Sequence, residues 1–485
     1  MSTALEGLDP RLVWKYFGEI SRIPRCSKQE GKIVRYVKET ARTLGLESRS
    51  DSSGNVVVKK PASPGKEHVP MLALQGHLDM VCEKNKDTVH DFSKDPITII
   101  RDGAFLKAQG TTLGADNGIA VATNLAIMED RSLQHGPLEF LFTVDEETGL
   151  TGAANLKPGF LESRTLINLD SEEEGALYVG CSGGRNTAAT WRFESSTVPA
   201  RHAPGLLTVR GLRGGHSGLE IDKGRGNAVK ILNRVLVVLG DAGVRVAAID
   251  GGNKHNAIPR EAEARVFILE KQWEDAMETV KGMNEALRAE LKTVDPDLTV
   301  TLERTRGGRR GKVLKKAFQR KLLGALSALP HGVMKMSADI PGLVETSTNV
   351  AVISSSGRSI QMVTSQRSSV ASEIDEICHS VSSIFELSGA SVKAGDGYPA
   401  WTPNMDSPVL KLARETYRSL FGKDPEVKAI HAGLECGIIG EKMPGTDMVS
   451  FGPTLEMVHS PEERIHIESV DRYWRFLLAI LRNFS

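Results

Sequence analysis

The chain has 485 residues, 40% of them hydrophobic and 25% charged, which is the ordinary balance of a soluble globular protein. This length exceeds one ordinary core, so we expect two or three domains. Lys and Arg together number 61, as do Asp and Glu, so no charge excess indicates nucleic acid or an anionic membrane as a partner. No apolar run is long enough to span a membrane, and residues 1–10 lack the features of a signal peptide.

The cysteines are scattered and form no CxxC pair. They are Cys26, Cys82, Cys181, Cys378 and Cys436. This usage, without a signal peptide, predicts reduced thiols and a cytosolic protein.

The N-terminal part predicts two helices and a hairpin. Asp9-Pro10 has the pattern of a helix N-cap followed by the first helical residue, which predicts a helix over 11–23. Residues 27–30 have capping-box spacing and predict a second helix, which Gly45 ends. A hairpin at the edge of a sheet is expected over 46–60.

Three continuous apolar runs alternate with helices, including a helix over 119–128 that follows a loop of small residues. This pattern predicts a mostly parallel sheet covered on both faces. In such sheets, sites form beyond the carboxyl ends of the strands. Polar side chains follow each run: His77 and Asp79 after 71–75, Asp145, Glu146 and Glu147 after 138–144, and Asp170 after 166–169.

His77 and Asp79 are two positions apart at the end of the first run. In an extended chain such residues point to the same side. The pair suits a metal ligand with an orienting carboxylate, or a catalytic pair that activates a nucleophile.

The pattern changes between about 185 and 395. Strands over 206–212, 262–269 and 298–304 alternate with helices over 226–239 and 272–291, and a similar order follows from 315 to 394. We interpret this segment as two α+β halves, each a small sheet with helices on one face. The basic run 304–316 is interpreted as a solvated loop, because no aromatic residues interrupt it.

The α/β character returns after about 395. A helix over 408–421, strands over 426–430 and 448–451, and a last helix over 470–484 are expected, and residues 460–463 have capping-box spacing. The predicted arrangement is one α/β domain built from residues 1–186 and 396–485, with residues 187–395 inserted.

Two imidazoles and several carboxylates gather on the expected loops and strand ends of the outer segments. Such a ligand set suits borderline divalent metals such as Zn, Mn or Co. The carboxylates are too many for one zinc ion, and a bridging carboxylate between two ions would account for them. On an extended segment Glu146 and Glu147 would point opposite ways, so that one binds metal while the other acts as a general base. The set comprises His77, Asp79, Asp116, Glu146, Glu147, Asp170 and His459.

The motifs GHLDMV, TTLGADNG, DEETGLTGA, NLDSEEEG, GGHSG, NAIPREA, HAGLECG and GPTLEMVHSPEE stand in this order along nearly the whole chain. They resemble the M20 metallopeptidase family and, within it, the aminoacyl-histidine dipeptidases. The resemblance implies a di-metal peptidase domain, an inserted domain that acts as a lid and dimerisation surface, and a cis peptide between Asp116 and Asn117.

The resemblance also implies roles for the outer residues. His77 and Asp170 would bind one metal, His459 and Glu147 the other, and Asp116 would bridge them. Glu146 matches the general base, and Asp79 the acid that orients His77. Two divalent ions are implied, with Zn²⁺ expected and Co²⁺ or Mn²⁺ as alternatives.

In the inserted segment, His216 matches a lid histidine that stabilises the oxyanion, with an incidental residue of a Gly-rich turn as the alternative. Asn256 and Arg367 are candidates for holding substrate, Arg367 through the C-terminal carboxylate, with a surface salt bridge as its alternative. Glu435 is either a substrate contact or part of a structural turn. The family suggests a homodimer, yet a doubled lid can supply within one chain what a partner would supply, so His216 could act in its own subunit or across an interface.

We therefore predict a cytosolic, metal-dependent dipeptidase acting on unblocked dipeptides, with a preference for a C-terminal His, carnosine-like compounds included. Water bridging the two metals would lose its proton to Glu146 and attack the scissile carbonyl. Alternatives are an N-deacylase or carboxypeptidase-like activity of the same family, a non-catalytic metal-stabilised binding protein, and an interaction protein that works through its insertion.

Overall fold

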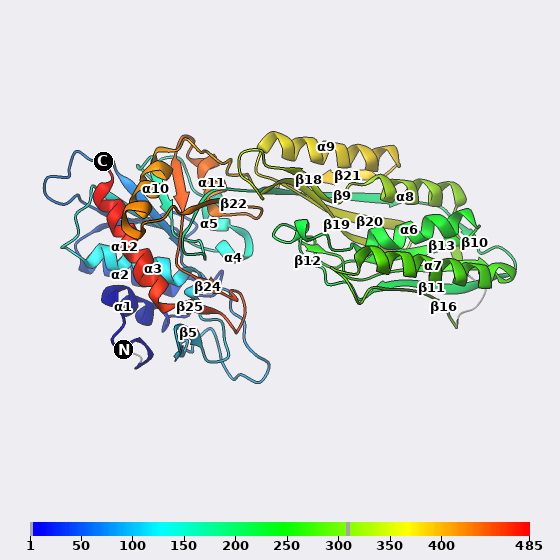
Figure 1. Ribbon diagram of the computed structural model, residues 1–485, viewed down its shortest axis with the longest axis horizontal. Coiled ribbons are helices and arrows are strands. Elements are labelled where there is room, and N and C mark those ends of the chain that lie inside the picture. Colours follow the sequence, from blue (N-terminus) through cyan, green and yellow to red (C-terminus); the bar gives the residue numbers. More distant parts are fainter. Residues whose placement is uncertain (1–2, 307–310) are drawn as a thin grey trace. The chain divides into compact units, whose positions relative to one another are not determined.

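A computed structural model describes residues 3–306 and 311–485, and the chain divides into two compact units (Figure 1). The outer unit comprises Met1–Gly180, Pro403–Ala429 and Leu434–Ser485, and the inserted unit comprises Cys181–Thr402 and Ile430–Gly433. Both ends of the chain therefore belong to the outer unit. The domain boundaries expected at 186/187 and 395/396 stay a prediction.

An eight-stranded mixed sheet lies at the centre of the outer unit. Its strands follow the order β1-β2-β6-β3-β7-β23-β8-β22, and the four central strands β6, β3, β7 and β23 pair in parallel with one another. All residues of β3 and β6 are buried, as expected of strands covered on both faces. The bounds are β1 (Glu47–Ser50), β2 (Val56–Lys60), β3 (Leu72–His77), β6 (Leu138–Thr143), β7 (Thr165–Asn168), β8 (Ala176–Cys181), β22 (Glu426–Ile430) and β23 (Asp447–Ser450).

Helices cover this sheet: α3 packs on β3, α2 on β1 and β2, and α10 on β23. A separate four-stranded sheet has the order β24-β25-β5-β4, and β4 and β5 form the hairpin around Gly103. The helices are α1 (Arg11–Ile20), α2 (Gly31–Thr43), α3 (Ala115–Glu129), α4 (Glu146–Gly149), α5 (Thr151–Ala154), α10 (Pro408–Phe421), α11 (Glu435–Lys442) and α12 (Ile467–Asn483), and the strands are β4 (Ile99–Asp102), β5 (Phe105–Ala108), β24 (Leu455–Glu456) and β25 (Arg464–His466).

The inserted unit contains one continuous antiparallel sheet. The order is β16-β11-β15-β13-β19-β20-β9-β21, and β18 also pairs with β19. The two expected halves are joined through β13 and β19, where Gly251 pairs with Ile353, so they do not form two separate small sheets. The bounds are β9 (Gly183–Arg192), β11 (His202–Arg210), β13 (Arg245–Gly251), β15 (Ala262–Leu269), β16 (Thr299–Arg304), β18 (Gly332–Met336), β19 (Val344–Ser356), β20 (Ser359–Ser368) and β21 (Ser391–Ala394).

Four helices line one face of this sheet, because α7 contacts α6, α6 contacts α8 and α8 contacts α9. Leu, Val and Ile side chains from helices and strands form the core between the two layers. The bounds are α6 (Ala228–Asp241), α7 (Trp273–Leu291), α8 (Lys316–Ala328) and α9 (Ala371–Leu387), and two further strand pairs are β10 (Ser195–Thr197) with β17 (Lys312–Leu314) and β12 (Gly215–His216) with β14 (Ala257–Ile258).

Both predicted capping boxes are wrong. Helix α2 begins at Gly31, and the Ser27 hydroxyl donates instead to Asp79 Oδ2 at 2.8 Å. Residues 460–463 open no helix: strand β25 follows them and α12 begins at Ile467. Likewise Pro10, and not Asp9, is the N-cap of α1. In each case the pattern assigned a short polar side chain to the start of a helix. The structure gives that side chain another partner or places it outside the helix cap.

The basic run 304–316 is only partly covered by the structure, since residues 307–310 lie outside the described residues. The described part differs from the expected loop: Arg304 ends β16, residues 312–314 form β17, and α8 begins at Lys316. The basic run therefore includes ordered elements of the inserted unit.

A disulfide joins Cys26 to Cys82, contrary to the expectation of reduced thiols throughout. The two cysteines are 56 positions apart in the sequence, and the adjacent bridge between Cys26 and Met80 brings them together. Sequence spacing held no sign of this proximity. Across residues 3–306 and 311–485, none of the helices is long and apolar enough to cross a membrane.

Candidate active site

The carboxyl ends of β6, β3 and β7 meet at one edge of the outer sheet, because these three strands are parallel neighbours. β3 ends on His77, which is 1% exposed, and Asp79 follows, fully buried. Asp170 comes two residues after β7, and α4 starts three residues after β6. The predicted clustering of these side chains at the strand ends is present.

Two histidines contact the same carboxylate. His77 Nε2 lies 3.1 Å from Asp116 Oδ1 and 3.3 Å from Asp170 Oδ1. His459 Nε2 lies 3.1 Å from Asp116 Oδ2 and 3.0 Å from Glu147 Oε2. Asp116 thus offers one oxygen to each imidazole and lies between two groups of possible ligands.

The charges of this cluster are unbalanced. Burial opposes protonation of His77, but Asp170 and Asp116 outweigh it and raise the His77 pKa well above its usual value. Hydrogen bonds with Asp116 and Glu147 raise the pKa of His459 to about 11. Burial raises the pKa of Asp170 to about 6. Neighbouring carboxylates contribute to all three shifts, and added positive charge would relieve their excess.

Divalent cations would supply that positive charge, and the residues fit them. In each of the two groups the possible ligand atoms lie within 4.8 Å of one another. Imidazole nitrogens and carboxylate oxygens are ligands of Zn²⁺ and similar ions. The groups are His77, Asp116 and Asp170, and Asp116, Glu147 and His459.

Asp79 lies on the other side of the His77 ring. Its Oδ1 is 3.4 Å from His77 Nδ1 and accepts the Glu146 backbone N–H at 3.1 Å. Its Oδ2 accepts the Glu147 backbone N–H and the Ser27 hydroxyl. Burial would raise the pKa of Asp79, yet His77 and these hydrogen bonds lower it to about 2. The ionised carboxylate therefore holds both the imidazole and the start of α4.

Glu146 and Glu147 belong to the short helix α4, so the expectation of an extended segment is wrong. Successive side chains of a helix diverge by about 100° because one turn takes 3.6 residues. Glu147 contacts His459, whereas burial raises the Glu146 pKa well above its usual value, with Asp170 and Glu435 adding to the shift. The two adjacent acids thus still face different surroundings.

Glu435 begins α11 and is fully buried. Its Oε2 accepts hydrogen bonds from Gln75 Nε2 at 2.6 Å and from Thr143 Oγ1 at 2.7 Å, so it lies against β3 and β6. Burial raises its pKa to about 7. Contact with substrate stays a prediction for this residue.

The loop that carries Asp116 is held by two buried side chains that the sequence analysis missed. The Glu463 carboxylate accepts the four successive backbone N–H groups of residues 113–116, at 2.7 to 3.2 Å. The Arg25 guanidinium donates to the carbonyls of Leu78, Asp79 and Gly114. The sequence signal for Glu463 was the SPEE pattern of residues 460–463. A capping box contains an acidic side chain that accepts backbone N–H groups, and Glu463 does this for a loop and not for a helix.

The peptide between Asp116 and Asn117 is cis, as the resemblance implied. The Asn117 side chain joins two strand ends, because its Oδ1 accepts the His77 N–H at 3.2 Å and its Nδ2 donates to the Leu169 carbonyl at 3.0 Å. Backbone with positive φ occurs at Asp145 and His459, a conformation that non-glycine residues adopt mainly where surrounding contacts enforce it.

The predicted residues of the inserted unit also lie together. His216 is in β12, which pairs with β14, and the Ser217 N–H donates to the Asn256 carbonyl at 2.9 Å. A Cβ at Gly218 would lie 3.1 Å from His216 Cε1 and 3.2 Å from Arg367 Nε, so both side chains border this glycine. The lack of a side chain at Gly218 thus allows the side chains of His216 and Arg367 to lie close to the backbone of the GGHSG segment.

Arg367 lies in β20 and is 7% exposed, unlike the surface salt bridge considered as its alternative. It donates to the Tyr398 hydroxyl at 2.5 Å, and its Nε has no partner among the described residues. Burial, followed by the charge of Arg367, lowers the pKa of His216 to about 4. A neutral imidazole and an unpaired guanidinium therefore border one another.

A sheet whose strand ends gather two imidazoles around a shared carboxylate, with an inserted α+β unit, is the architecture that the motifs indicated. Residues 73–483 match Peptidase family M20/M25/M40, so the chain belongs to this family. The prediction of an M20 metallopeptidase is confirmed.

Two relatives sharpen this assignment. The chain is 41% identical over 479 residues to the cytosol non-specific dipeptidase of Escherichia coli (strain K12), covering 99% of this chain and 98% of that protein. The crystal structure of aminoacylhistidine dipeptidase from Vibrio alginolyticus superposes with a TM-score of 0.92 at 40% identity, covering 99% of this chain and 98% of that chain. The expected resemblance to the aminoacyl-histidine dipeptidases is confirmed. The aminopeptidase PepT of Bacillus cereus shares the fold, with a TM-score of 0.57 at 15% identity and coverage of 98% of each chain.

Proposed function

We propose that this chain is a metal-dependent dipeptidase that hydrolyses unblocked dipeptides, Xaa-His and carnosine-like dipeptides among them. The observation that carries the proposal is Asp116, whose two oxygens lie 3.1 Å from His77 and 3.1 Å from His459. Support also comes from the two relatives at 40% identity or more, both of which are dipeptidases.

Two metal ions would occupy the two groups of ligands. His77 and Asp170 would hold one ion, His459 and Glu147 the other, and Asp116 both. We propose Zn²⁺, with Co²⁺ or Mn²⁺ as alternatives. When bound, the ions would polarise the scissile carbonyl and lower the pKa of water.

Glu146 is the proposed general base. Its carboxylate takes a proton from the attacking water and later gives it to the leaving amine. A carboxyl whose pKa burial raises well above the usual value can hold that proton between the two steps. Asp79 keeps the His77 ring in place, as carboxylates commonly do behind metal-binding histidines.

The inserted unit would bind the substrate and stabilise the oxyanion. His216 Nδ1 accepts the backbone N–H groups of Gly218 at 3.3 Å and Leu219 at 3.1 Å. The proton of the neutral ring is therefore on Nε2, where it can be donated to an oxyanion. Arg367 would pair with the C-terminal carboxylate of the dipeptide and Asn256 would add a polar contact.

We further propose a cytosolic location and a homodimer formed through the inserted unit, with His216 acting in its own subunit or across the interface. The Escherichia coli relative carries "cytosol" in its name.

A dipeptide panel assayed with and without chelator tests the proposal. We expect hydrolysis of free dipeptides, its loss with chelator and its return with added Zn²⁺, Co²⁺ or Mn²⁺. N-acetylated dipeptides should remain intact. Hydrolysis that chelators leave unchanged would remove the metal from the mechanism, and preferential cleavage of acetylated substrates would indicate an N-deacylase instead.

A further inference from the structure

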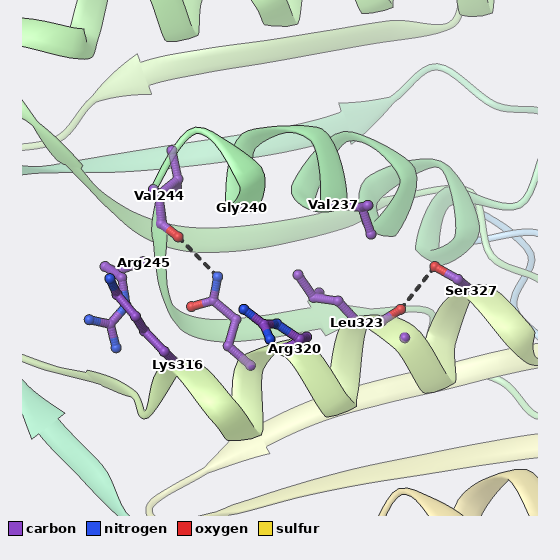
Figure 2. Close-up of a pocket in the computed structure, with 11 residues that line it drawn as sticks. Val237, Gly240, Val244, Arg245, Lys316, Arg320, Leu323 and Ser327 are labelled. Atoms are coloured by element: carbon purple, nitrogen blue, oxygen red, sulfur yellow. Dashed lines mark hydrogen bonds between the residues drawn. The ribbon is translucent and has the colours of Figure 1, made fainter.

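A pocket of about 450 Å³ lies between α6 and α8 of the inserted unit (Figure 2). This volume is within the range of pockets that bind small molecules. His216, Asn256 and Arg367 do not line it. The pocket is thus separate from the residues proposed to hold the dipeptide.

One end of the pocket is basic. Arg245, Lys316 and Arg320 line it, and no Asp or Glu is among its described lining residues. Figure 2 shows Arg245 and Lys316 together near the start of α8, with Arg320 one turn further along the helix. Like charges placed together without acids repel one another, and a bound anion would relieve this repulsion.

Arg245 is the buried member of this group, with 7% of its surface exposed. It donates to the Leu314 carbonyl, and its Nε has no hydrogen-bond partner among residues 3–306 and 311–485. Burial lowers the pKa of Arg245, and no described carboxylate opposes this shift. A buried cation without a counter-charge is unusual, because buried charges are normally paired.

The N-terminal end of helix α8 adds to the positive potential. Helix α8 starts at Lys316 without a side-chain cap, so its first backbone N–H groups and its positive dipole end lie beside the basic residues. At the C-terminus of α6, the carbonyls of Leu239 and Gly240 already accept the N–H groups of Val244 and Gly243. The negative end of α6 is therefore partly satisfied.

The other end of the pocket is aliphatic. Val237 and Leu323 lie there in Figure 2, and small residues such as Gly240 and Gly324 also line the pocket. No aromatic side chain is among the described lining residues, and both polar atoms of the Gln319 amide are bonded to the backbone, at Val246 and Val244. These surroundings suit an aliphatic body, and the described lining provides no aromatic ring on which a nucleobase could stack.

We propose that this pocket binds a small organic anion. Its phosphate or carboxylate group would lie among Arg245, Lys316 and Arg320, and its short aliphatic body against Val237 and Leu323. Lys316 belongs to the basic run 304–316, for which the sequence and the proposed reaction give no other use. Binding here does not depend on the dipeptidase activity.

Calorimetric titration of the full chain tests the proposal, with n-butyl phosphate and hexanoate as probes for the two head groups. Inorganic phosphate and n-butanol serve as the charge-only and apolar-only comparisons. We expect at least one of the two anionic probes to bind with a Kd of roughly millimolar or tighter. Binding should be the same in metal-loaded and metal-free protein, and weaker with added NaCl.

Variants place the binding in this pocket. Lys316→Glu combined with Arg320→Glu should weaken binding at least about tenfold, as expected for two reversed charges near an anion. Lys321→Glu is the matched control: it is exposed on the same helix but does not line the pocket, and it should change binding less than about twofold. Thermal unfolding of each variant shows that the fold is kept.

Three kinds of result would overturn the proposal. The first is no binding of either butyl phosphate or hexanoate. The second is equal weakening by the double variant and by Lys321→Glu, or binding that disappears in metal-free protein, since both would place the anion elsewhere. The third is equal affinity for inorganic phosphate and butyl phosphate, which would contradict the role given to the aliphatic end.

Discussion

Histidines of the two units lie in opposite electrostatic surroundings. In the outer unit, carboxylates raise the pKa of His77 well above its usual value and that of His459 to about 11. In the inserted unit, burial and the charge of Arg367 lower the pKa of His216 to about 4 and that of His431 to about 3. His77 and His459 are therefore surrounded by negative charge, whereas His216 and His431 are buried near a positive charge.

In the proposed mechanism this difference separates the tasks of catalysis. Excess carboxylates suit divalent cations, and an unpaired guanidinium beside a neutral imidazole suits a substrate carboxylate and an oxyanion. The residue type alone does not decide how a histidine is used. Its neighbours decide whether it is a ligand in an acidic cluster or a hydrogen-bond donor near a cation.

Removing the base of the outer cluster should have the largest effect. Glu146→Ala should lower kcat by about 10²- to 10⁴-fold, because the attacking water loses its proton acceptor. Steady-state kinetics on a free dipeptide measures this, with Glu162→Gln, an exposed acid of the same unit, as the control. A loss of less than about tenfold would rule out the general-base role.

The next largest effect is expected from Arg367 in the inserted unit. Arg367→Met should lower kcat/KM by about 10- to 100-fold, the range of hydrogen bonds to a charged group. The loss should be much smaller for a dipeptide amide, which has no carboxylate to bind. Arg185→Met, at a half-buried arginine of the same unit paired with Asp375, is the matched control. Equal losses on acid and amide would contradict carboxylate binding.

Asp79→Asn should cost about 10- to 100-fold in metal affinity or activity while the protein stays folded. The amide keeps the size of the side chain but removes the charge that faces His77. Metal titration and circular dichroism together measure this. If the variant matches wild type in both metal affinity and activity, Asp79 is only a turn residue.

Glu463→Gln should weaken metal binding by roughly tenfold, the lower end of the effect of residues behind metal ligands. An amide at this position cannot accept all four N–H groups of residues 113–116, so the Asp116 loop would loosen. Its exposed neighbour offers the control Glu462→Gln. Glu463→Gln should lower the unfolding temperature, whereas Glu462→Gln should not.

The smallest expected effect is a change in the pKa of His216. In Arg367→Met the pKa of His216 should rise from about 4 but stay below 6.5, because burial, the larger cause, remains. Since the folded-state pKa lies below the unfolded value, protonation favours unfolding as the pH falls from about 6.5 towards 4. NMR titration of the histidines should show this rise, and an unchanged His216 pKa would mean that Arg367 does not act on it.

Much of the fold was predictable from apolar runs and helix signals. The buried strands β3, β6 and β7 lie where the continuous apolar runs placed them, because such runs need cover on both faces. Strand β13 was missed, and the predicted halves of the insertion share one sheet. Pairing between strands far apart in the sequence is decided by packing, which local patterns do not record.

The site was predictable to a similar degree. The motifs gave the candidate ligands, yet Arg25 and Glu463 escaped notice, because a sequence pattern does not show which distant backbone groups a side chain will bond. The capping-box patterns of Ser27 and Glu463 were misleading for the same reason: a side chain able to cap a helix can equally bond Asp79 or a loop. The disulfide depends on proximity of Cys26 and Cys82 that only the folded chain creates.

The central feature of the account is that Asp116 contacts both His77 and His459. The number of metal ions bound per chain tests this feature most directly. Calorimetric titration of the metal-free chain with Zn²⁺, checked by elemental analysis after dialysis, should give two ions per chain for wild type. His77→Ala and His459→Ala should each retain one tightly bound ion, whereas Asp116→Ala should weaken both. One ion in wild type, or two tightly bound ions in Asp116→Ala, would contradict a two-metal site bridged by this carboxylate.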